Sequence, residues 1–451
     1  MSSLLVEIDP VVQTKDGDPL GSVFIETYGC QMNVSDSELM RGVLGDAGFS
    51  SADSIQEADV VLLNTCAIRE HAEERVLGRL SQLRHLKTRK PDLVLGVCGC
   101  MAKHMSEKLM DRLPYVDLVL GPDSYRDLAD LVVRSRNEPS LSVRLDRAEH
   151  YDGVDPVRTD GVNAWVTVQR GCDKFCTFCV VPYVRGRERS VRSDEVVRQV
   201  EVAAADGFKE VTLLGQTVNS YHDGVCDFPE LLRRLSNVQG IDRVRFTSPH
   251  PSDFDDRLIA TIAEVDEICK FVHLPVQSGS TKVLKRMQRT YSRESYLALV
   301  ERLREEIPSL ALSTDIIVGF PDETAGDFEE TLELVRRVRF DFAFMFKYSE
   351  REGTVAHREI PDTVPETEKS SRLESLIELQ SRISAEVNNE YIGSVLDVLV
   401  EGKARKGKGR VYGKSDGFKT VVFTSEALPN TIVPVRITSA TQKTLLGEVT
   451  A

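Results

Sequence analysis

The chain has 451 residues, which is more than one ordinary hydrophobic core accommodates and predicts two or three domains. Its 41% hydrophobic and 28% charged residues are typical of a soluble globular protein, and no apolar run is long enough to span a membrane. The net charge of −14 weighs against nucleic acid as a partner of the chain as a whole.

The first 20 residues are polar and irregular, and we expect a loose leader there. They lack the basic flank and apolar stretch of a secretory signal, so we expect a cytoplasmic protein, in a compartment where thiols stay reduced. The nine cysteines therefore need an explanation other than disulfides. Cys226 and Cys269 stand alone, and each is predicted to be a core residue.

Residues 21–137 alternate apolar strands with amphipathic helices, which predicts an open parallel sheet with helices on its faces. The strands are expected at 22–27, 58–65, 93–99 and 116–121, and the helices at 35–48, 69–87 and 123–135. The polar stretch 138–160 is predicted to be a linker.

Thiols follow three of these strands directly. Cys30 comes after the first, Cys66 after the second, and Cys98 and Cys100 after the third. Because ligand sites in parallel sheets form at the carboxyl ends of the strands, these positions predict a joint metal site. Geometry alone does not choose between Cys98 and Cys100.

A second series of strands and helices fills residues 161–388. Six strands are expected, at 163–170, 210–215, 243–248, 271–276, 312–319 and 340–346. Six units are fewer than the eight of a closed barrel, which predicts a partial (βα)6 barrel with its functional loops after the strands.

Cys172, Cys176 and Cys179 follow the first strand of this series, with no fourth cysteine nearby. Three thiolates can hold three irons of a 4Fe–4S cube and leave the fourth iron open for a substrate. Structural zinc wants four protein ligands, catalytic zinc usually includes His or a carboxylate, and thiol redox chemistry uses CxxC pairs. The spacing therefore favours an iron–sulfur cluster.

Residues 389–451 read as short strands with Gly-rich turns, which predicts a small antiparallel β-barrel of the nucleic-acid-binding kind. This segment carries nine Lys and Arg against five Asp and Glu. RNA contacts are expected from a basic run interleaved with Tyr412 and Phe418. The run consists of Lys403, Arg405, Lys406, Lys408, Arg410 and Lys414. The competing interpretation is a solvated charged edge.

Further positive charge follows the three-cysteine loop, at Arg185, Arg187, Arg189 and Arg192. We expect these side chains near the mouth of the partial barrel, with Arg187 and Arg189 as RNA contacts. Salt-bridged residues at the start of a helix are the alternative.

The CxxxCxxC loop after the first barrel strand resembles that of the radical S-adenosylmethionine (SAM) enzymes, and Phe178 matches the aromatic residue before their third cysteine. The segments TYGCQMN, LNTCAIRE, GCMA, FTSPHP, HLPVQSGS and DIIVGFPDET extend the resemblance to the tRNA 2-methylthio-N(6)-dimethylallyladenosine synthases, from about residue 21 to the end. It implies an α/β methylthiotransferase domain, a radical SAM barrel and a TRAM-like domain.

The same resemblance implies a second, auxiliary 4Fe–4S cluster on Cys30, Cys66 and Cys100, with Cys100 rather than Cys98 as the third ligand. One SAM molecule would methylate a cluster-bound sulfur, and a second would generate the radical at C2 of the adenine. The implied partners are tRNA, an electron donor such as flavodoxin or ferredoxin, and a sulfur donor that the sequence does not identify.

Related enzymes that share this layout modify other substrates. One group methylthiolates an aspartate of a ribosomal protein, and another modifies threonylcarbamoyl-adenosine in tRNA. Gln31, Met32 and Asn33 after the first cysteine resemble the dimethylallyladenosine enzymes instead. A non-catalytic iron–sulfur electron-transfer module is a more remote alternative, which two incompletely ligated clusters argue against.

Contacts to SAM are expected from Phe178 and from polar residues at the barrel loops. These are Gln216, Asn219, Ser248, Gln277 and Asp315. Each of the polar residues could equally make only a local hydrogen bond. His250 and His273 fit supporting or core positions as well as catalytic ones, and no residue stands out as a general base.

Overall fold

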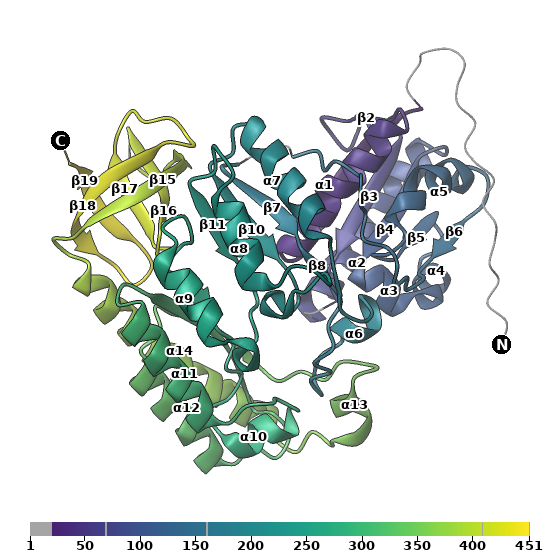
Figure 1. Cartoon of the computed structure of the whole chain (residues 1–451). Coiled ribbons are helices and arrows are strands. Elements are labelled where there is room, and N and C mark those ends of the chain that lie inside the picture. The colour runs from purple at the N-terminus through teal and green to yellow at the C-terminus, as the bar shows by residue number, and fades with distance from the viewer. Residues whose placement is uncertain (1–19, 68–69, 159–160, 408, 451) are drawn as a thin grey trace. The chain divides into compact units, whose positions relative to one another are not determined.

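A computed structural model describes residues 20–67, 70–158, 161–407 and 409–450 (Figure 1). The chain divides into two compact units, one up to residue 159 together with Tyr183–Gly186, the other containing the rest. Among the described residues, no helix is long and apolar enough to cross a membrane. The expected leader, apart from Leu20, lies outside the described residues.

The first unit contains a six-stranded parallel sheet in the order β2-β1-β3-β4-β5-β6. Its strands are β1 (Ser22–Tyr28), β2 (Ser50–Ser51), β3 (Val60–Thr65), β4 (Val94–Gly99), β5 (Leu118–Leu120) and β6 (Ser140–Ser142). All residues of β3 and β4 are buried, as expected for central strands covered on both faces. The open parallel sheet predicted from the sequence is confirmed.

Two hydrophobic cores lie on the two faces of this sheet. Helices α1 (Gln31–Asp46) and α5 (Leu128–Ser135) contribute to one core. The other core draws on α2 (Glu70–Arg89), α3 (Cys100–Met105) and α4 (Glu107–Arg112).

The stretch 138–160, expected to be a linker, packs on this unit. Strand β6 pairs with β5, and Tyr151 and Val154 are buried in one of the cores. The Tyr151 hydroxyl donates to the carbonyl oxygen of Pro122 at 2.7 Å. Polar composition hides this packing in the sequence, because the two buried apolar side chains and the short strand lie among polar and charged residues.

The second unit contains the partial barrel. Two three-stranded parallel sheets, in the orders β11-β10-β7 and β12-β13-β14, are joined by a bridge between Val244 and Ile268. Their strands are β7 (Asn163–Thr167), β10 (Glu210–Leu214), β11 (Arg243–Phe246), β12 (Phe271–His273), β13 (Ala311–Val318) and β14 (Phe342–Lys347). Six expected barrel strands are therefore present. The short strands β8 (Gln169–Arg170) and β9 (Arg189–Ser190) pair separately.

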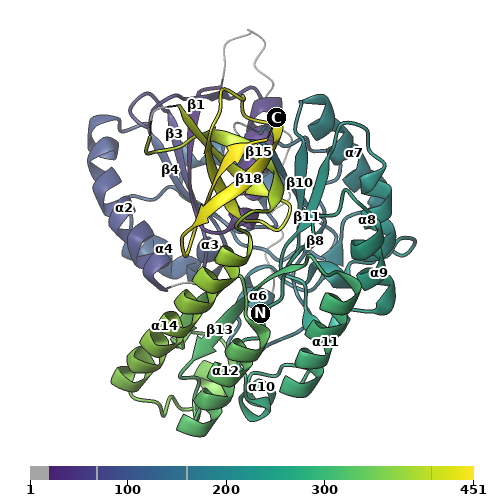
Figure 2. The same cartoon turned by 90° about the vertical axis from the view of Figure 1, so that its left-hand side faces the viewer.

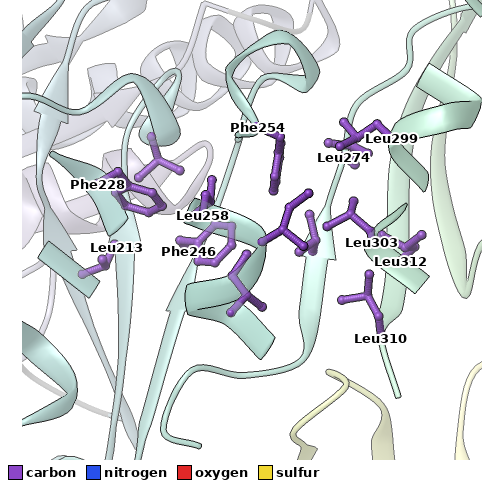
Figure 3. Packing of buried hydrophobic residues seen from close by; sticks show 14 of the residues in the cluster. Leu213, Phe228, Phe246, Phe254, Leu258, Leu274, Leu299, Leu303, Leu310 and Leu312 are labelled. Atoms are coloured by element: carbon purple, nitrogen blue, oxygen red, sulfur yellow. The ribbon is translucent and has the colours of Figure 1, made fainter. Parts of the chain in front are cut away.

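Helices cover the outer side of these strands and form the largest core with them. Figure 3 shows part of it, with Phe228, Phe246 and Leu258 packed together. The helices are α7 (Ser193–Ala205), α8 (Phe228–Ser236), α9 (Asp256–Glu264), α10 (Thr281–Arg286), α11 (Arg293–Glu306) and α12 (Ala325–Val338). The short helix α13 (Val355–Glu359) contributes Ala356 to a separate, smaller cluster instead. Side chains on the opposite side of the strands therefore line the interior of the partial barrel.

The 25-residue helix α14 (Glu366–Glu390) leads into a small closed barrel (Figure 2). Its strands are β15 (Val395–Lys403), β16 (Arg410–Ser415), β17 (Thr420–Thr424), β18 (Ile432–Ala440) and β19 (Leu445–Val449). Four pairings are antiparallel, as expected, whereas β17 and β19 pair in parallel and close the barrel.

The turn between β16 and β17 packs against the starts of the partial-barrel strands. Phe418 in this turn stacks on Phe271, with ring centroids 4.9 Å apart. Arg245 donates to the carbonyl oxygens of Ser415 and Asp416 at 2.8 and 2.7 Å. Both barrels of this unit therefore share a packed, hydrogen-bonded contact.

Candidate metal centres

The first candidate centre lies at the carboxyl edge of the sheet in the first unit. Cys30 occupies the N-cap position of α1 after β1, Cys66 follows β3, and Cys100 begins α3 after β4. Because β1, β3 and β4 are neighbours in parallel register, the three thiols reach the same edge.

The electrostatics show that these thiols are close together. A hydrogen bond with Cys66 lowers the pKa of Cys30, against the effect of burial. Burial is the main cause that raises the pKa of Cys100, and the charge of Cys30 raises it further. The predicted convergence of Cys30, Cys66 and Cys100 is therefore seen in the structure.

Two buried asparagines hold this edge in place. The Asn33 amide donates to Asn64 Oδ1 at 3.2 Å, and the Asn64 amide donates to the Asn33 carbonyl at 2.8 Å. The Cys30 thiol donates to Asn33 Oδ1 at 3.4 Å. Asn64 is not among the residues predicted from the sequence, although a polar residue at the end of the apolar run VVLLNT is a signal for it.

Backbone geometry explains the glycine before Cys100. Gly99 has a φ of 93°, and a Cβ there would lie 2.5 Å from Asn64 Oδ1. A larger residue would both strain the backbone and push the asparagine away. Gly99 thus allows α3 to begin at Cys100, immediately after β4 ends.

A buried guanidinium distinguishes Cys100 from Cys98. Arg185 Nε donates to Cys100 Sγ at 3.1 Å, and its Nη2 donates to Asp36 Oδ2 at 2.6 Å. Cys98 instead lies fully buried in a hydrophobic core, which raises its pKa. A cube of iron and sulfide with thiolate ligands carries negative charge, and this positive group beside Cys100 suits it.

The second candidate centre follows the first strand of the partial barrel. Burial and the neighbouring charges of Cys176 and Cys172 raise the pKa of Cys179, so these three thiols also lie near one another. Arg289 Nη1 donates to Cys176 Sγ at 3.3 Å. In each set of three cysteines, a sulfur therefore accepts a hydrogen bond from an arginine.

The loop that carries Cys172, Cys176 and Cys179 is braced through Thr177. Its backbone N–H donates to the Met287 carbonyl at 3.1 Å, and its carbonyl accepts from the Ala356 N–H at 2.8 Å. Phe178 packs edge-on against Phe320, with ring centroids 6.5 Å apart. Phe178 thus packs against the small hydrophobic cluster that contains Phe320.

Among the described residues, no group of three or more His, Cys, Asp or Glu side chains is arranged to hold a single metal ion. A cube places each thiolate on a different iron, so its ligands need not meet at one point. The donor set of each centre therefore fits a 4Fe–4S cluster better than a mononuclear ion.

The polar residues expected to contact SAM have different local environments in the structure. Asn219 exchanges two hydrogen bonds with the His250 backbone, at 2.9 and 2.7 Å, which fits the local alternative. Gln216 Oε1 is buried and has no hydrogen-bond partner among the described residues. Buried polar atoms are normally hydrogen-bonded, so this oxygen is available to a ligand. Ser248 and Gln277 adopt positive φ angles of 57° and 69° at the strand ends.

Asp315 lies deeper, on β13, where one of its carboxylate oxygens is 3.4 Å from His273 Nε2. The Gln277 N–H donates to the Asp315 carbonyl at 2.8 Å, which places these two residues side by side. Asp315 therefore faces the barrel interior together with His273.

The arginines after the cysteine loop have separate environments. Arg185 is buried in the first unit, where it forms an ion pair with Asp36 at 2.6 Å. Arg187 is exposed and forms an ion pair with Asp173 at 2.6 Å. Arg189 is 8% exposed.

Comparisons with known proteins agree with this layout. Residues 22–121 match the model of "Uncharacterized protein family UPF0004", 166–335 that of the "Radical SAM superfamily" and 389–450 that of the "TRAM domain". A protein of Thermoanaerobacter pseudethanolicus named tRNA-2-methylthio-N(6)-dimethylallyladenosine synthase is 44% identical over 432 residues, covering 94% of this chain and 92% of the relative. A protein of that name from Chlorobium luteolum is 46% identical over 428 residues, covering 94% and 96%.

The chain belongs to the tRNA 2-methylthio-N(6)-dimethylallyladenosine synthase family. It is an enzyme of the radical SAM superfamily, which uses a 4Fe–4S cluster and SAM.

Solved structures support the fold of this family member. The radical SAM methyltransferase TsrM from Kitasatospora setae, with tryptophan and a SAM analogue bound, aligns with a TM-score of 0.54 at 16% identity, over 72% of each chain. The cobalamin-dependent radical SAM enzyme OxsB aligns with a TM-score of 0.53 at 12% identity, over 80% of this chain and 56% of OxsB.

Proposed function

We propose that the enzyme adds a methylthio group to C2 of N(6)-dimethylallyladenosine next to the anticodon of tRNA, using two SAM molecules and two 4Fe–4S clusters. The observation that carries this proposal is the pair of three-cysteine centres, each with an arginine donating to a cysteine sulfur, in a chain 44–46% identical to enzymes of that name. A fully ligated electron-transfer centre would need a fourth ligand in each set.

When bound, the clusters supply the electron that cleaves SAM to a 5′-deoxyadenosyl radical and the sulfur that is transferred. In the proposal, Cys172, Cys176 and Cys179 hold the cluster of the radical step, and Cys30, Cys66 and Cys100 hold the auxiliary cluster. Arg289 and Arg185 donate hydrogen bonds to these two sets and compensate their negative charge. Gln216 is the best-placed of the expected SAM contacts, because its side-chain oxygen is buried without a partner among the described residues.

Mass spectrometry of tRNA nucleosides tests the reaction. A strain that lacks the enzyme should lose 2-methylthio-N(6)-dimethylallyladenosine, accumulate the unthiolated nucleoside and recover on complementation. If the threonylcarbamoyl-adenosine product disappears instead, or a ribosomal-protein aspartate loses its methylthio group, the proposed substrate is replaced by that alternative.

The small barrel is proposed to bind the tRNA. Lys403, Arg405, Lys406 and Arg410 are exposed at the ends of β15 and β16 and in the turn between them, and Lys408 lies outside the described residues. Lys414 is partly buried instead, with Nζ 2.8 Å from Thr420 Oγ1 and 4.4 Å from the Phe418 ring centroid. The RNA surface is therefore proposed on the β15–β16 turn rather than on Lys414, with Arg187 as an exposed candidate elsewhere.

The double substitution Lys403→Ala/Arg405→Ala should weaken tRNA binding and reduce the slope of log K against log salt by about 1 to 2, because phosphate contacts release counterions. The matched control is Arg436→Ala/Lys443→Ala, two exposed basic residues of the same barrel. Fluorescence anisotropy across salt concentrations measures both. If both double variants show the same slope of log K against log salt, the charges on the β15–β16 turn are only a solvated edge and do not contact RNA.

The proposal also places the enzyme in the cytoplasm, with an electron donor of the flavodoxin or ferredoxin type. The electron donor follows from the proposed reaction, since each radical step consumes one low-potential electron.

A further inference from the structure

The interior of the partial barrel is aromatic on one side. In the register of β12, β13 and β14, His273 lies beside Ser313, and Asp315 lies beside Phe344. The alternate residues of β13, including Leu312 and Ile316, belong to the core under the helices. Because side chains alternate along a strand, Phe344 faces the interior.

A column of rings runs up this interior face. Phe418 stacks on Phe271 at 4.9 Å, and Phe271 stacks on Phe342 at 5.8 Å. Phe344 meets Phe342 edge-on at 5.8 Å and meets the His273 ring at 5.8 Å. The column thus rises from the packed base of the barrel towards the carboxyl ends of the strands, where the cysteine loop begins.

Phe344 is the open end of this column. Phe271 is 8% exposed, whereas Phe344, in the middle of the edge strand β14, is 48% exposed. An apolar ring left open in a concave interior is a favourable contact surface for an apolar or aromatic ligand. The His273–Asp315 pair beside it offers hydrogen-bonding groups for the edge of such a ligand.

We propose that Phe344 packs against the dimethylallyl-adenine of the substrate and makes the enzyme prefer the dimethylallylated nucleoside over plain adenosine. This inference rests on the proposed function. A phenyl ring can stack on a base, and its edge can cover the apolar five-carbon chain, which plain adenosine lacks. Phe344 is therefore a specificity-determining residue.

The test compares anticodon stem-loop RNAs with and without the dimethylallyl group, bound to the anaerobically reconstituted enzyme. Trp165 is the chain's only tryptophan and lies on β7, where its neighbours Ala164 and Val166 face the helix-side core, so it faces the interior. Quenching of its fluorescence reports entry of a base into the barrel, and anisotropy of labelled RNA gives the affinity.

The parent enzyme should bind the dimethylallylated RNA more tightly, and Phe344→Ala should reduce that preference about tenfold. Phe344→Tyr should retain it, because the ring remains. The control Ile377→Ala removes a residue of α14 that is 41% exposed and should leave the preference unchanged. Matching circular dichroism and iron content would show that the variants are folded and loaded.

The outcomes separate the two levels of the proposal. A parent enzyme without preference for the dimethylallylated RNA would overturn the proposed substrate and this inference together. If the parent has the preference and Phe344→Ala keeps it, only the role of Phe344 is overturned. A loss of SAM affinity in Phe344→Ala, with the RNA preference intact, would assign the ring to the adenine of SAM and also overturn the inference.

Discussion

Cys179→Ala should abolish 5′-deoxyadenosine formation, whereas Cys66→Ala should leave SAM cleavage in place and abolish the methylthio product. The two residues belong to different units, and each thiol lies with its own set of three. Loss of one ligand should therefore destroy one cluster and spare the other. Anaerobic turnover with dithionite, with 5′-deoxyadenosine and modified tRNA measured separately, gives both readouts.

Iron analysis provides the control for this experiment. The reconstituted parent should hold about eight irons, and removal of all three cysteines of one set should leave about four. Cys98→Ala is the matched control for Cys100→Ala. Cys98 lies in the adjacent hydrophobic core, whereas Cys100 accepts the hydrogen bond from Arg185. If Cys98→Ala loses an iron cluster and Cys100→Ala keeps both, the ligand set proposed for the first centre is wrong.

A second result would contradict separate roles for the two centres. If Cys66→Ala stops SAM cleavage as completely as Cys179→Ala while the radical-site cluster remains by iron count, the two centres do not act separately. One zinc per chain without labile sulfide would remove the cluster assignment altogether.

The thiol positions could be predicted because they depend only on strand order and chain direction. Cys30 and Cys66 each follow a strand, and parallel strands deliver their ends to one edge. The choice between Cys98 and Cys100 depends on which side of the strand end each thiol faces. That choice becomes visible only with Arg185, which comes from a segment 85 residues further along the chain.

Arg185 shows the limit of reading charge from sequence. Four arginines at 185, 187, 189 and 192 look alike as a basic run, yet Arg185 is buried against Asp36 and Arg187 is exposed beside Asp173. Segment 183–186 returns to the first unit although it lies within the second along the chain. Such a long-range return leaves no local periodicity to detect.

The small barrel shows a similar limit. Its strands were recognisable, but the parallel pairing of β17 with β19 and the contact of Phe418 with Phe271 join residues far apart in the sequence. The sequence pattern made Phe418 a candidate for stacking on RNA bases. In the structure its ring lies against Phe271, and Lys414 and Arg245 cover it at 4.4 and 5.2 Å.

Phe418→Ala should therefore destabilise the partial barrel rather than only weaken RNA binding. The substitution removes a ring stacked between the two barrels, at a cost of about 2–4 kcal/mol. Thermal unfolding followed by Trp165 fluorescence measures this effect, since Trp165 lies in β7 of the partial barrel. The matched control is Tyr412→Ala, another partly buried aromatic residue of the small barrel, which should leave this transition nearly unchanged.

Removal of the whole small barrel should have a larger effect. Arg243 and Arg245 are 5% and 4% exposed, and each donates two hydrogen bonds of 2.7–2.8 Å to backbone carbonyls of the small barrel. A chain ending near residue 390 would leave both guanidinium groups short of acceptors, which costs more than loss of a neutral hydrogen bond. If that truncated chain keeps the Trp165 transition of the parent, the small barrel is an independent RNA-binding appendage. A lower transition temperature in both Phe418→Ala and the truncated chain would make it a structural part of the catalytic barrel, so RNA binding should then be tested by the surface substitutions alone.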